Sequence, residues 1–207
     1  MAPSLFTRHK ERLDTEHHEG KHGDILAQVA QAQQLPDPAS AQLSVHDHIV
    51  TDLILWRHAE AEDLEETDED GGDDLSRRLT AKGERQASRM AAWLDRQLPD
   101  GVKVLSSPAV RTEQTVLSLG RKYKTHTALA PDGSAQDLLQ LIHWPKPGPA
   151  HLIVGHQPVL GHVVAQLLGL QAGECSIRKG AVWWLRHRIK KGLPQTILVC
   201  MQSPDML

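Results

Sequence analysis

The chain has few cysteines and few aromatic side chains. Among its 207 residues there are two cysteines, Cys175 and Cys200, and the aromatic residues are five Trp, one Tyr and one Phe. Two cysteines permit at most one disulfide, which is too few for a disulfide-stapled scaffold, and their spacing is not that of a metal site. We therefore expect a fold held by a hydrophobic core, in a reducing compartment.

A strong net charge and a long apolar run are also missing. The formal net charge is −3, which provides no basic field for sequence-independent binding of nucleic acid. No segment reaches the ~18 apolar residues of a membrane span, and the first residues lack the apolar run of a signal peptide. These absences predict a cytoplasmic protein whose partners include neither nucleic acid nor a membrane.

The composition that remains is that of a globular protein with a distinct N-terminal segment. A chain of 207 residues suits one α/β domain of roughly 150 residues with an appendage. Residues 1–50 hold six of the thirteen histidines, and one amphipathic helix is expected over residues 24–35. The apolar face of that helix is too small to fold alone, so we expect an accessory extension, partly helical or disordered. His18 and His22 have the spacing of two metal ligands on a helix, but no third ligand accompanies them, and we expect solvated histidines and no metal.

The most informative stretch is a buried-strand pattern that runs directly into two polar side chains. Residues 53–56 are four consecutive apolar residues, which indicates a strand covered on both faces. Arg57 and His58 follow at once. Ligands of open α/β sheets bind where strands end at their carboxyl edge, so we expect these two side chains to line a crevice.

The same pattern recurs twice. Strands expected over residues 102–105 and 151–154 each run into a turn that is followed by a helix. Pro108 suits the first position of the earlier helix, which puts Arg111 in its first turn. His156 lies in the exit turn of the later strand, so both side chains are expected at the same edge as His58.

Further elements alternate along the chain. Helices are expected after an N-cap at Thr80 up to residue 98, and over residues 109–123, 134–144 and 159–168; an irregular or edge segment over 125–133; and two antiparallel strands over 181–185 and 196–201, joined by a turn in the basic stretch 186–191. Strands that alternate with helices predict an α/β fold, a three-layer sandwich with a mostly parallel central sheet flanked by helices.

Residues 60–74 form an acidic segment. They contain ten carboxylates and no Lys or Arg. Like charges at this density repel one another and keep a segment extended, so we expect a solvated loop. A role in repelling or selecting charged partners near the site is the alternative.

The side chains gathered at the three strand exits indicate a site for an anion. Arg57, His58, Arg111 and His156 together supply two guanidinium groups and two imidazoles. Phosphoryl groups fit best, because guanidinium forks match their oxygens and an imidazole can be a nucleophile as well as a donor. The alternatives are a satisfied core histidine at position 58 and a surface cation at position 111, but a cation in the first turn of a helix opposes the helix dipole unless an anion is near.

Four ordered motifs make the chain resemble the histidine phosphatase superfamily, and most of all its SixA-type phosphohistidine phosphatases. The motifs are Arg57-His58-Ala59-x-Ala61, Arg77-x-Leu79-Thr80-x-x-Gly83, Ser106-Ser107-Pro108-x-x-Arg111-Thr112-x-Gln114-Thr115 and Val154-Gly155-His156-Gln157-Pro158. The likeness covers about residues 51–203, so residues 51–207 are interpreted as the histidine phosphatase domain. It implies a phosphoglycerate mutase-like fold.

The resemblance also implies a mechanism without metal or cofactor. His58 would attack phosphorus and become phosphohistidine, which water would then hydrolyse, while Arg57, Arg111 and His156 would hold the equatorial oxygens. Arg77 matches a further phosphate-binding arginine, although the next residue is arginine where the pattern often has proline.

The leaving group separates the candidate substrates. An alkoxide needs a proton from a general acid, whereas the imidazole of phosphohistidine departs more readily. The carboxylates between Arg111 and His156 are Glu113, Asp132 and Asp137, and none stands in the context of such an acid. We therefore expect a histidine-phosphorylated protein as substrate. The alternatives are a small phosphomonoester or nucleotide, with Asp132 or Glu113 as acid, and a catalytically idle phosphoprotein-binding module.

Overall fold

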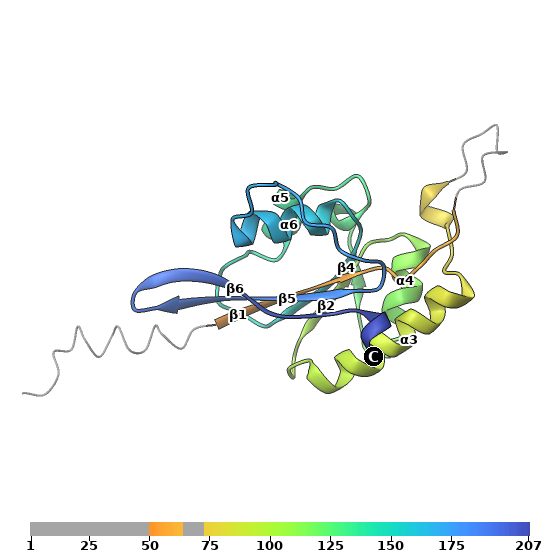
Figure 1. Cartoon of the computed structure of the whole chain (residues 1–207), viewed down its shortest axis with the longest axis horizontal. Helices are drawn as coiled ribbons and strands as arrows, with labels where there is room; N and C mark the ends of the chain where they lie inside the picture. Colours follow the sequence, from red (N-terminus) through yellow and green to blue (C-terminus); the bar gives the residue numbers. More distant parts are fainter. Residues whose placement is uncertain (1–49, 64–72) are drawn as a thin grey trace, which may run out of the picture. The chain divides into compact units, whose positions relative to one another are not determined.

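The computed structural model describes residues 50–63 and 73–207, in which the strands form one six-stranded sheet with the order β3-β2-β4-β1-β5-β6 (Figure 1). The strands are β1 Val50–Arg57, β2 Lys103–Ser106, β3 Lys124–Thr125, β4 His151–Gly155, β5 Val182–Lys190 and β6 Leu193–Gln202. The helices are α3 Ala81–Gln97, α4 Val110–Leu117, α5 Ala135–Leu141 and α6 Val159–Leu168, with single 3₁₀ turns η1 Asp74–Ser76, η2 Thr127–Leu129 and η3 Pro204–Met206.

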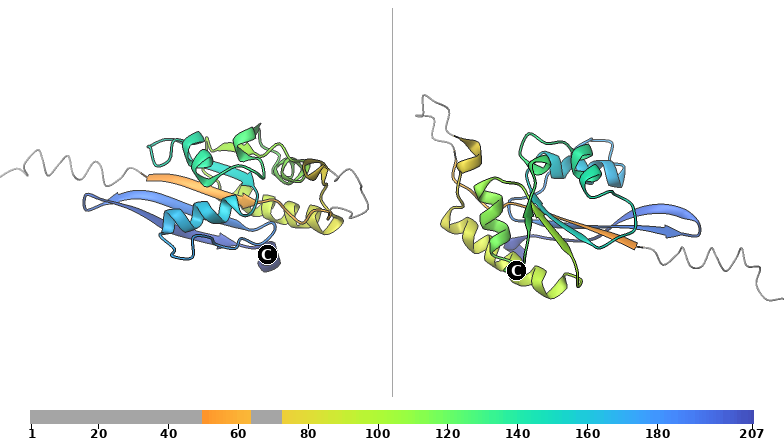
Figure 2. Two further views of the ribbon diagram at one scale, coloured as in Figure 1. Left: turned by 90° about the horizontal axis from the view of Figure 1, so that it is seen from above. Right: turned by 180° about the vertical axis from the view of Figure 1, so that it is seen from behind.

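The sheet is mixed and lies between two layers of helices. Strands β3, β2, β4 and β1 run parallel to one another, and β5 is antiparallel to both β1 and β6. Helices α5 and α6 pack on one face and α3 and α4 on the other, as Figures 1 and 2 show. The predicted three-layer α/β fold is confirmed.

Strand β1 explains why both faces are covered. Leu53 and Leu55 pack into the cluster under α5 and α6, while Ile54 and Trp56 pack into the cluster under α3 and α4. All four side chains are fully buried, and burial of each contributes about 1.5–3 kcal/mol. This strand is therefore fixed in the middle of the core, and because it ends at Arg57, the next residue, His58, lies at the carboxyl edge of the sheet.

Two helices match their sequence-based predictions closely. The Thr80 hydroxyl caps α3 by accepting a hydrogen bond from the N–H of Gly83 at 3.0 Å, and the predicted apolar face of the helix is buried. Helix α6 has the predicted bounds and ends at Gly169, whose φ of 66° is a left-handed C-cap conformation.

Three other predictions on helices need correction. Helix α4 ends at Leu117 instead of residue 123, because Gly120, with a φ of 67°, closes a turn that stops it. Pro108 lies before the N-cap residue Ala109 and is not the first helical residue, since the Ser107 hydroxyl accepts a hydrogen bond from the Ala109 N–H and turns the chain there. Helix α5 likewise ends at Leu141 instead of residue 144.

The predicted antiparallel strand pair is confirmed, with its turn at the end of the basic stretch 186–191, but the strands are longer than predicted and most of that stretch is strand. Strands β5 and β6 extend to Lys190 and from Leu193, so only two residues form the turn. Arg186 is held within β5 by two hydrogen bonds, of 2.6 and 2.8 Å, to the carboxylate of Asp52 on β1. A basic side chain with a carboxylate directly across the strand pair is compatible with a sheet.

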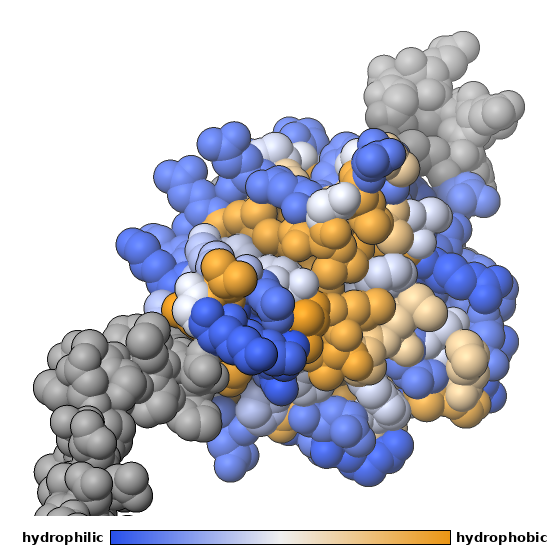
Figure 3. All heavy atoms as spheres, turned by 60° about the vertical axis from the view of Figure 1, so that its left-hand side comes forward, coloured by the Kyte–Doolittle hydropathy of each residue, from blue (hydrophilic) through white to orange (hydrophobic). Residues whose placement is uncertain are grey.

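Strand β6 is at an edge of the sheet and is partly apolar on the outside. Its exposed large apolar residues are Leu193, Leu198, Val199 and Met201. Figure 3 shows a broad apolar area on one face of the molecule, bordered by hydrophilic residues. In the described part of the chain, no helix combines the length and apolarity that crossing a bilayer requires.

Several predictions fall outside the described residues. The helix expected over residues 24–35, the pair His18 and His22, and the interior of the acidic segment are among them.

Cys175 and Cys200 are both free thiols, so the one disulfide that the sequence permits is not formed.

Candidate active site

Three neighbouring strands end at the same edge of the sheet, and backbone hydrogen bonds tie their exit turns together. The N–H of His58, just after β1, donates to the carbonyl of Gly155 at the end of β4 at 3.0 Å. The N–H of Ser107, just after β2, donates to the carbonyl of Val154 at 3.0 Å. The strand order β2-β4-β1 therefore collects the three predicted motifs at one place.

The ring of His58 is buried and held in one orientation. It is 5% exposed, and its Nδ1 lies 2.7 Å from the carbonyl oxygen of Ala59. A carbonyl oxygen can only accept, so Nδ1 carries the proton and donates it. The second ring nitrogen, Nε2, then keeps its lone pair. Ala59 is itself fixed, because its N–H donates to the Thr115 hydroxyl at 3.1 Å.

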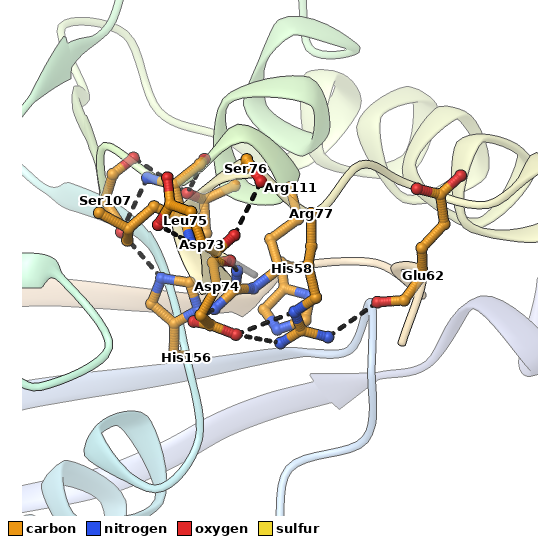
Figure 4. A network of polar contacts seen from close by, with 12 residues as sticks. His58, Glu62, Asp73, Asp74, Leu75, Ser76, Arg77, Ser107, Arg111 and His156 are labelled. Atoms are coloured by element: carbon orange, nitrogen blue, oxygen red, sulfur yellow. Dashed lines mark hydrogen bonds and ion pairs between the residues drawn. The ribbon is translucent and has the colours of Figure 1, made fainter. Parts of the chain in front are cut away.

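His156 lies beside His58. The two ring centroids are 5.2 Å apart, with the planes tilted by 53°. Nε2 of His156 makes a hydrogen bond of 2.8 Å with the Ser107 hydroxyl, and Nδ1 is buried with no partner among the described residues. This pair of imidazoles is the centre of the site that Figure 4 shows.

Two arginines present further buried donors. Nη1 of Arg57 donates to the carbonyl of Ile177 at 2.5 Å, and its Nε is buried without a partner in the described part of the chain. Arg111 is 2% exposed, and its Nε is also without a partner there. Leaving a buried donor unpaired costs about 1–3 kcal/mol. Together with Nδ1 of His156, these two Nε atoms make three buried, unpartnered nitrogens at three strand exits, which indicates a place for an anion.

The pKa values of both histidines are strongly lowered. Burial is the largest cause for each, and the Arg111 guanidinium adds to it. The pKa of His58 falls from 6.5 to about 3, against an opposing effect of the hydrogen bond to Ala59, and that of His156 falls from 6.5 to about 3. Both rings are therefore neutral at physiological pH.

We expect an NMR titration to show these two rings as neutral down to about pH 5. The ring signals of His58 and His156 should stay at neutral-form shifts in the folded protein, while the histidine signals of the urea-unfolded chain titrate near 6.5. Because the folded-state pKa values lie below 6.5, the unfolded chain binds protons that the folded chain does not, and the free energy of unfolding should fall as pH drops from 6.5 towards 3. A titration midpoint above about 6 for either folded ring would contradict this.

Arg77 and Asp74 complete the polar network. Arg77 donates from Nε to Asp74 Oδ1 at 2.9 Å and from Nη1 to the carbonyl of Glu62 at 2.9 Å. Asp74 also accepts from Arg111 Nη2 through Oδ2 at 2.7 Å and from Arg111 Nη1 through its main-chain oxygen. Arg77 thus lies near the other site residues, as Figure 4 shows. It is linked to Arg111 by the carboxylate of Asp74, a residue that the sequence analysis does not assign to the site.

The solvated loop predicted for residues 60–74 is therefore wrong at both ends of the segment. Glu60 accepts hydrogen bonds from Lys82 at 2.8 Å and Thr80 at 3.1 Å, and Asp74 binds two arginines. Desolvation raises the pKa of Asp74, but hydrogen bonds from Arg111 and Arg77 outweigh it, so the net pKa is lowered and the group is an anion at neutral pH. The only signal in the sequence is the spacing of Asp74 three residues before Arg77.

Of the three carboxylates that the sequence offered as general acids, Asp132 is exposed in the turn before α5, and Asp137 and Glu113 lie beside other groups. Asp137 accepts a hydrogen bond from the Ser134 hydroxyl at the start of α5, at 2.6 Å. Burial, followed by the charge of Glu113, raises the pKa of Tyr123, which places Glu113 near that phenol. Within residues 50–63 and 73–207, no cluster of three or more His, Cys, Asp or Glu could hold a metal ion.

A cavity of about 1250 Å³ lies away from this site. It opens beside Lys103 and His151, the first residues of β2 and β4, and is therefore at the amino edge of the parallel strands. Neither His58 nor His156 lines this cavity. Its position in the fold gives it no part in chemistry at the carboxyl edge.

Comparison with known proteins gives a family match and two curated relatives. Residues 53–132 match the family model of the histidine phosphatase superfamily, branch 1. The chain is 30% identical over 132 residues to the phosphohistidine phosphatase SixA homolog of Haemophilus influenzae, which covers 56% of this chain and 77% of the relative. It is 32% identical over 143 residues to an uncharacterized protein of Picosynechococcus, which covers 65% of this chain and 84% of the relative.

Solved structures share the fold. A crystal structure described as SixA from Agrobacterium tumefaciens has a TM-score of 0.60 at 21% identity and covers 74% of this chain and 98% of its own. The structure of the protein histidine phosphatase SixA complexed with tungstate has a TM-score of 0.58 at 24% identity and covers 75% of this chain and 98% of its own. At these identities the likeness establishes the phosphoglycerate mutase-like architecture.

Proposed function

This chain belongs to the histidine phosphatase superfamily, and we propose that it removes phosphate from phosphohistidine in a protein, through a phosphohistidine intermediate on His58 and without a metal. One observation carries the proposal. The Ala59 carbonyl holds the proton of His58 on Nδ1, so the Nε2 lone pair is free on a ring that lies 5.2 Å from His156, and three strand exits at this edge carry buried nitrogens without a partner among the described residues. A nucleophile next to unpaired donors is the arrangement that phosphoryl transfer requires.

In the first step, Nε2 of His58 attacks phosphorus. The new bond joins phosphorus to Nε2, and the bond that breaks joins phosphorus to the imidazole nitrogen of the substrate, which keeps the electron pair. That imidazole departs as a neutral ring when its other nitrogen already carries a proton, so no acid on the enzyme is needed.

In the second step, water attacks the phosphorus and His58 leaves. The Nε2–phosphorus bond breaks, and Nε2 takes back its electron pair. The Nδ1 proton, which has stayed on the ring and is donated to the Ala59 carbonyl, makes His58 a neutral leaving group. One proton of the water stays on the released phosphate, and the other stays there as well or passes to solvent.

Three donors are available to the phosphoryl oxygens. They are Nε of Arg57, Nε of Arg111 and Nδ1 of His156, all buried and unpartnered among the described residues. Nδ1 of a neutral His156 is a donor when the Ser107 hydroxyl donates to Nε2, which the 2.8 Å contact allows. Donors fixed in advance stabilise charge on the transferring group without reorganisation, and loss of one such donor typically costs about 10²–10³-fold in kcat.

The protonation state of Asp74 favours phosphohistidine over an alkyl ester. Asp74 contacts both Arg111 and Arg77, and its pKa is lowered by their hydrogen bonds after these overcome desolvation. A carboxylate that stays ionised cannot donate a proton to an alkoxide. A substrate whose leaving group needs no proton fits such a site.

A comparison of substrates with different leaving groups tests the proposal. Histidine-phosphorylated phosphotransfer domains should be hydrolysed with a kcat/KM about 10²–10⁴-fold above that for alkyl phosphates such as phosphoserine peptides, because an alkoxide leaving group needs a general acid that this site does not supply. Aryl phosphates, whose leaving groups are weak bases, serve as the matched control and should fall between. Alkyl phosphates turned over as fast as phosphohistidine would show that an acid is present and would favour a small phosphomonoester as substrate.

A further inference from the structure

The carboxylate of Asp74 joins two arginines of the site. Oδ2 accepts from Arg111 Nη2 at 2.7 Å, and Oδ1 accepts from Arg77 Nε at 2.9 Å and Nη2 at 2.7 Å. The main-chain oxygen of Asp74 accepts from the remaining terminal nitrogen of Arg111. Both terminal nitrogens of Arg111 are therefore engaged by a single residue, as Figure 4 shows.

This arrangement resembles a bound phosphoryl group. Guanidinium groups bind carboxylates and phosphates through the same pairs of N–H donors, so two carboxylate oxygens on two arginines take the positions that two phosphoryl oxygens would otherwise use. The Arg111 side chain is 3% exposed, and a buried cation without a counter-charge is strongly unfavourable. Asp74 supplies that counter-charge while the site holds no ligand.

The element that carries Asp74 can be displaced at little cost. The η1 turn has three residues, and none of them is buried. The Asp74 side chain is 40% exposed, and the turn itself is capped locally by Asp73, whose Oδ1 accepts from the Leu75 N–H at 3.0 Å. Moving η1 away from Arg111 therefore removes no side chain from the hydrophobic core.

We propose that Asp74 is a specificity-determining residue, an internal anion that holds Arg111 and Arg77 until a phosphoryl dianion displaces it. The inference rests on the proposed function of this site. When a monoanion replaces the Asp74 carboxylate, the negative charge beside the two arginines stays the same. When a phosphoryl dianion replaces it, that negative charge increases by one. The site thereby selects phosphoryl groups over monoanions, and the returning carboxylate helps to expel the phosphate product.

Binding of inorganic phosphate at neutral pH tests the proposal. Asp74→Asn keeps the size of the side chain and removes the competing charge, so we expect its Kd for phosphate, measured by titration calorimetry, to fall about tenfold, or about 1.4 kcal/mol. The matched control is Asp73→Asn, which makes the same change of charge one residue away. Because asparagine also accepts from the Leu75 N–H, the cap survives, and the Kd of this variant should stay within about twofold of wild type.

Thermal unfolding provides a second readout that also monitors folding. Without phosphate, Asp74→Asn should melt below wild type, because Arg111 is left as a buried cation with a weakened partner. Phosphate should then raise the Tm of Asp74→Asn more than that of wild type or Asp73→Asn, since a ligand stabilises in proportion to how tightly it binds the folded state.

The outcomes separate this inference from the proposed function. Phosphate binding that Asp74→Asn leaves unchanged would overturn the inference alone. Weaker binding in Asp74→Asn would overturn it too, and would mean that the carboxylate holds the arginines in position for the ligand. Failure of wild type and both variants to bind phosphate would overturn the phosphoryl site itself. Tighter binding in Asp74→Asn together with absent phosphohistidine turnover would support the inference and reject the proposed substrate.

Discussion

Replacing His58 with alanine is expected to lower kcat/KM for a histidine-phosphorylated protein by about 10⁴-fold or more. The reason is that the proposed reaction passes through a bond between phosphorus and Nε2 of this ring, and the second imidazole cannot substitute for it. Nε2 of His156 is already in a 2.8 Å hydrogen bond with Ser107, so its lone pair is not free to attack. The measurement is release of phosphate under single-turnover conditions.

The control must separate lost chemistry from lost structure. His151→Ala removes a histidine at the opposite end of β4, whose pKa is also lowered chiefly by burial, and should leave kcat/KM within a few-fold of wild type. His58→Ala should still bind inorganic phosphate, because the buried donors of Arg57, Arg111 and His156 remain. Wild type, mixed briefly with substrate, should carry a base-stable, acid-labile phosphoryl label on His58 that mass spectrometry can locate. Undiminished turnover by His58→Ala would eliminate this residue as the nucleophile.

The sequence was sufficient to predict the parts of the fold that depend on local pattern. Strand β1 was predictable because residues 53–56 are all apolar, and such a run is stable only where both faces of a sheet are covered. Helix α6 was predictable to the residue because its apolar positions recur with helical spacing and Gly169 ends it. The same strand-exit argument predicted that Arg57, His58, Arg111 and His156 would be brought to one edge.

What sequence reasoning missed depends on contacts between residues far apart in the chain. The sequence predicts that Asp74 lies in a solvated acidic loop. In the structure it binds Arg111 instead, because this arginine, 37 residues later, is buried and needs a counter-charge. Arg186 was assigned to a basic loop, and it belongs to a strand because Asp52, 134 residues earlier, lies across from it in the sheet. Such pairs have no periodic signature, so only the folded chain reveals them.

These two corrections share a physical cause that bears on function. Each involves a charged residue whose exposed, solvated state was the default expectation, and in each an opposite charge within 3 Å replaces the water. Between the neighbouring strands β1 and β5 the pair only supports structure. At the site the same kind of pair holds the guanidinium end of Arg111, whose Nε is buried without a partner among the described residues.

Replacing Arg111 with lysine is therefore expected to lower kcat/KM by about 10²–10³-fold although the charge is kept. One ammonium cannot present donors both at the terminal positions that Asp74 now occupies and where Nε now lies, because the guanidinium does this with separate nitrogens in a fixed fork. The loss should appear in kcat as well as KM, since charge on the transferring group spreads over its oxygens in the transition state. The comparison variant is Arg121→Lys, which changes an arginine paired with Asp95 on the surface and should stay within about twofold of wild type.

The pH dependence of Arg111→Lys gives that prediction a second, independent readout. A lysine at this buried position has its pKa lowered by desolvation, so it is charged below that pKa and neutral above it. Activity of the variant should then fall further as pH rises through the lowered lysine pKa, whereas wild type keeps its charge because a guanidinium stays protonated. A variant that retains activity within about threefold of wild type, with an unchanged pH profile, would mean that position 111 contributes a charge at a distance and no directed hydrogen bond. The proposal that separate nitrogens of Arg111 donate directed hydrogen bonds to the phosphoryl group would then be wrong, even if His58 remained the nucleophile.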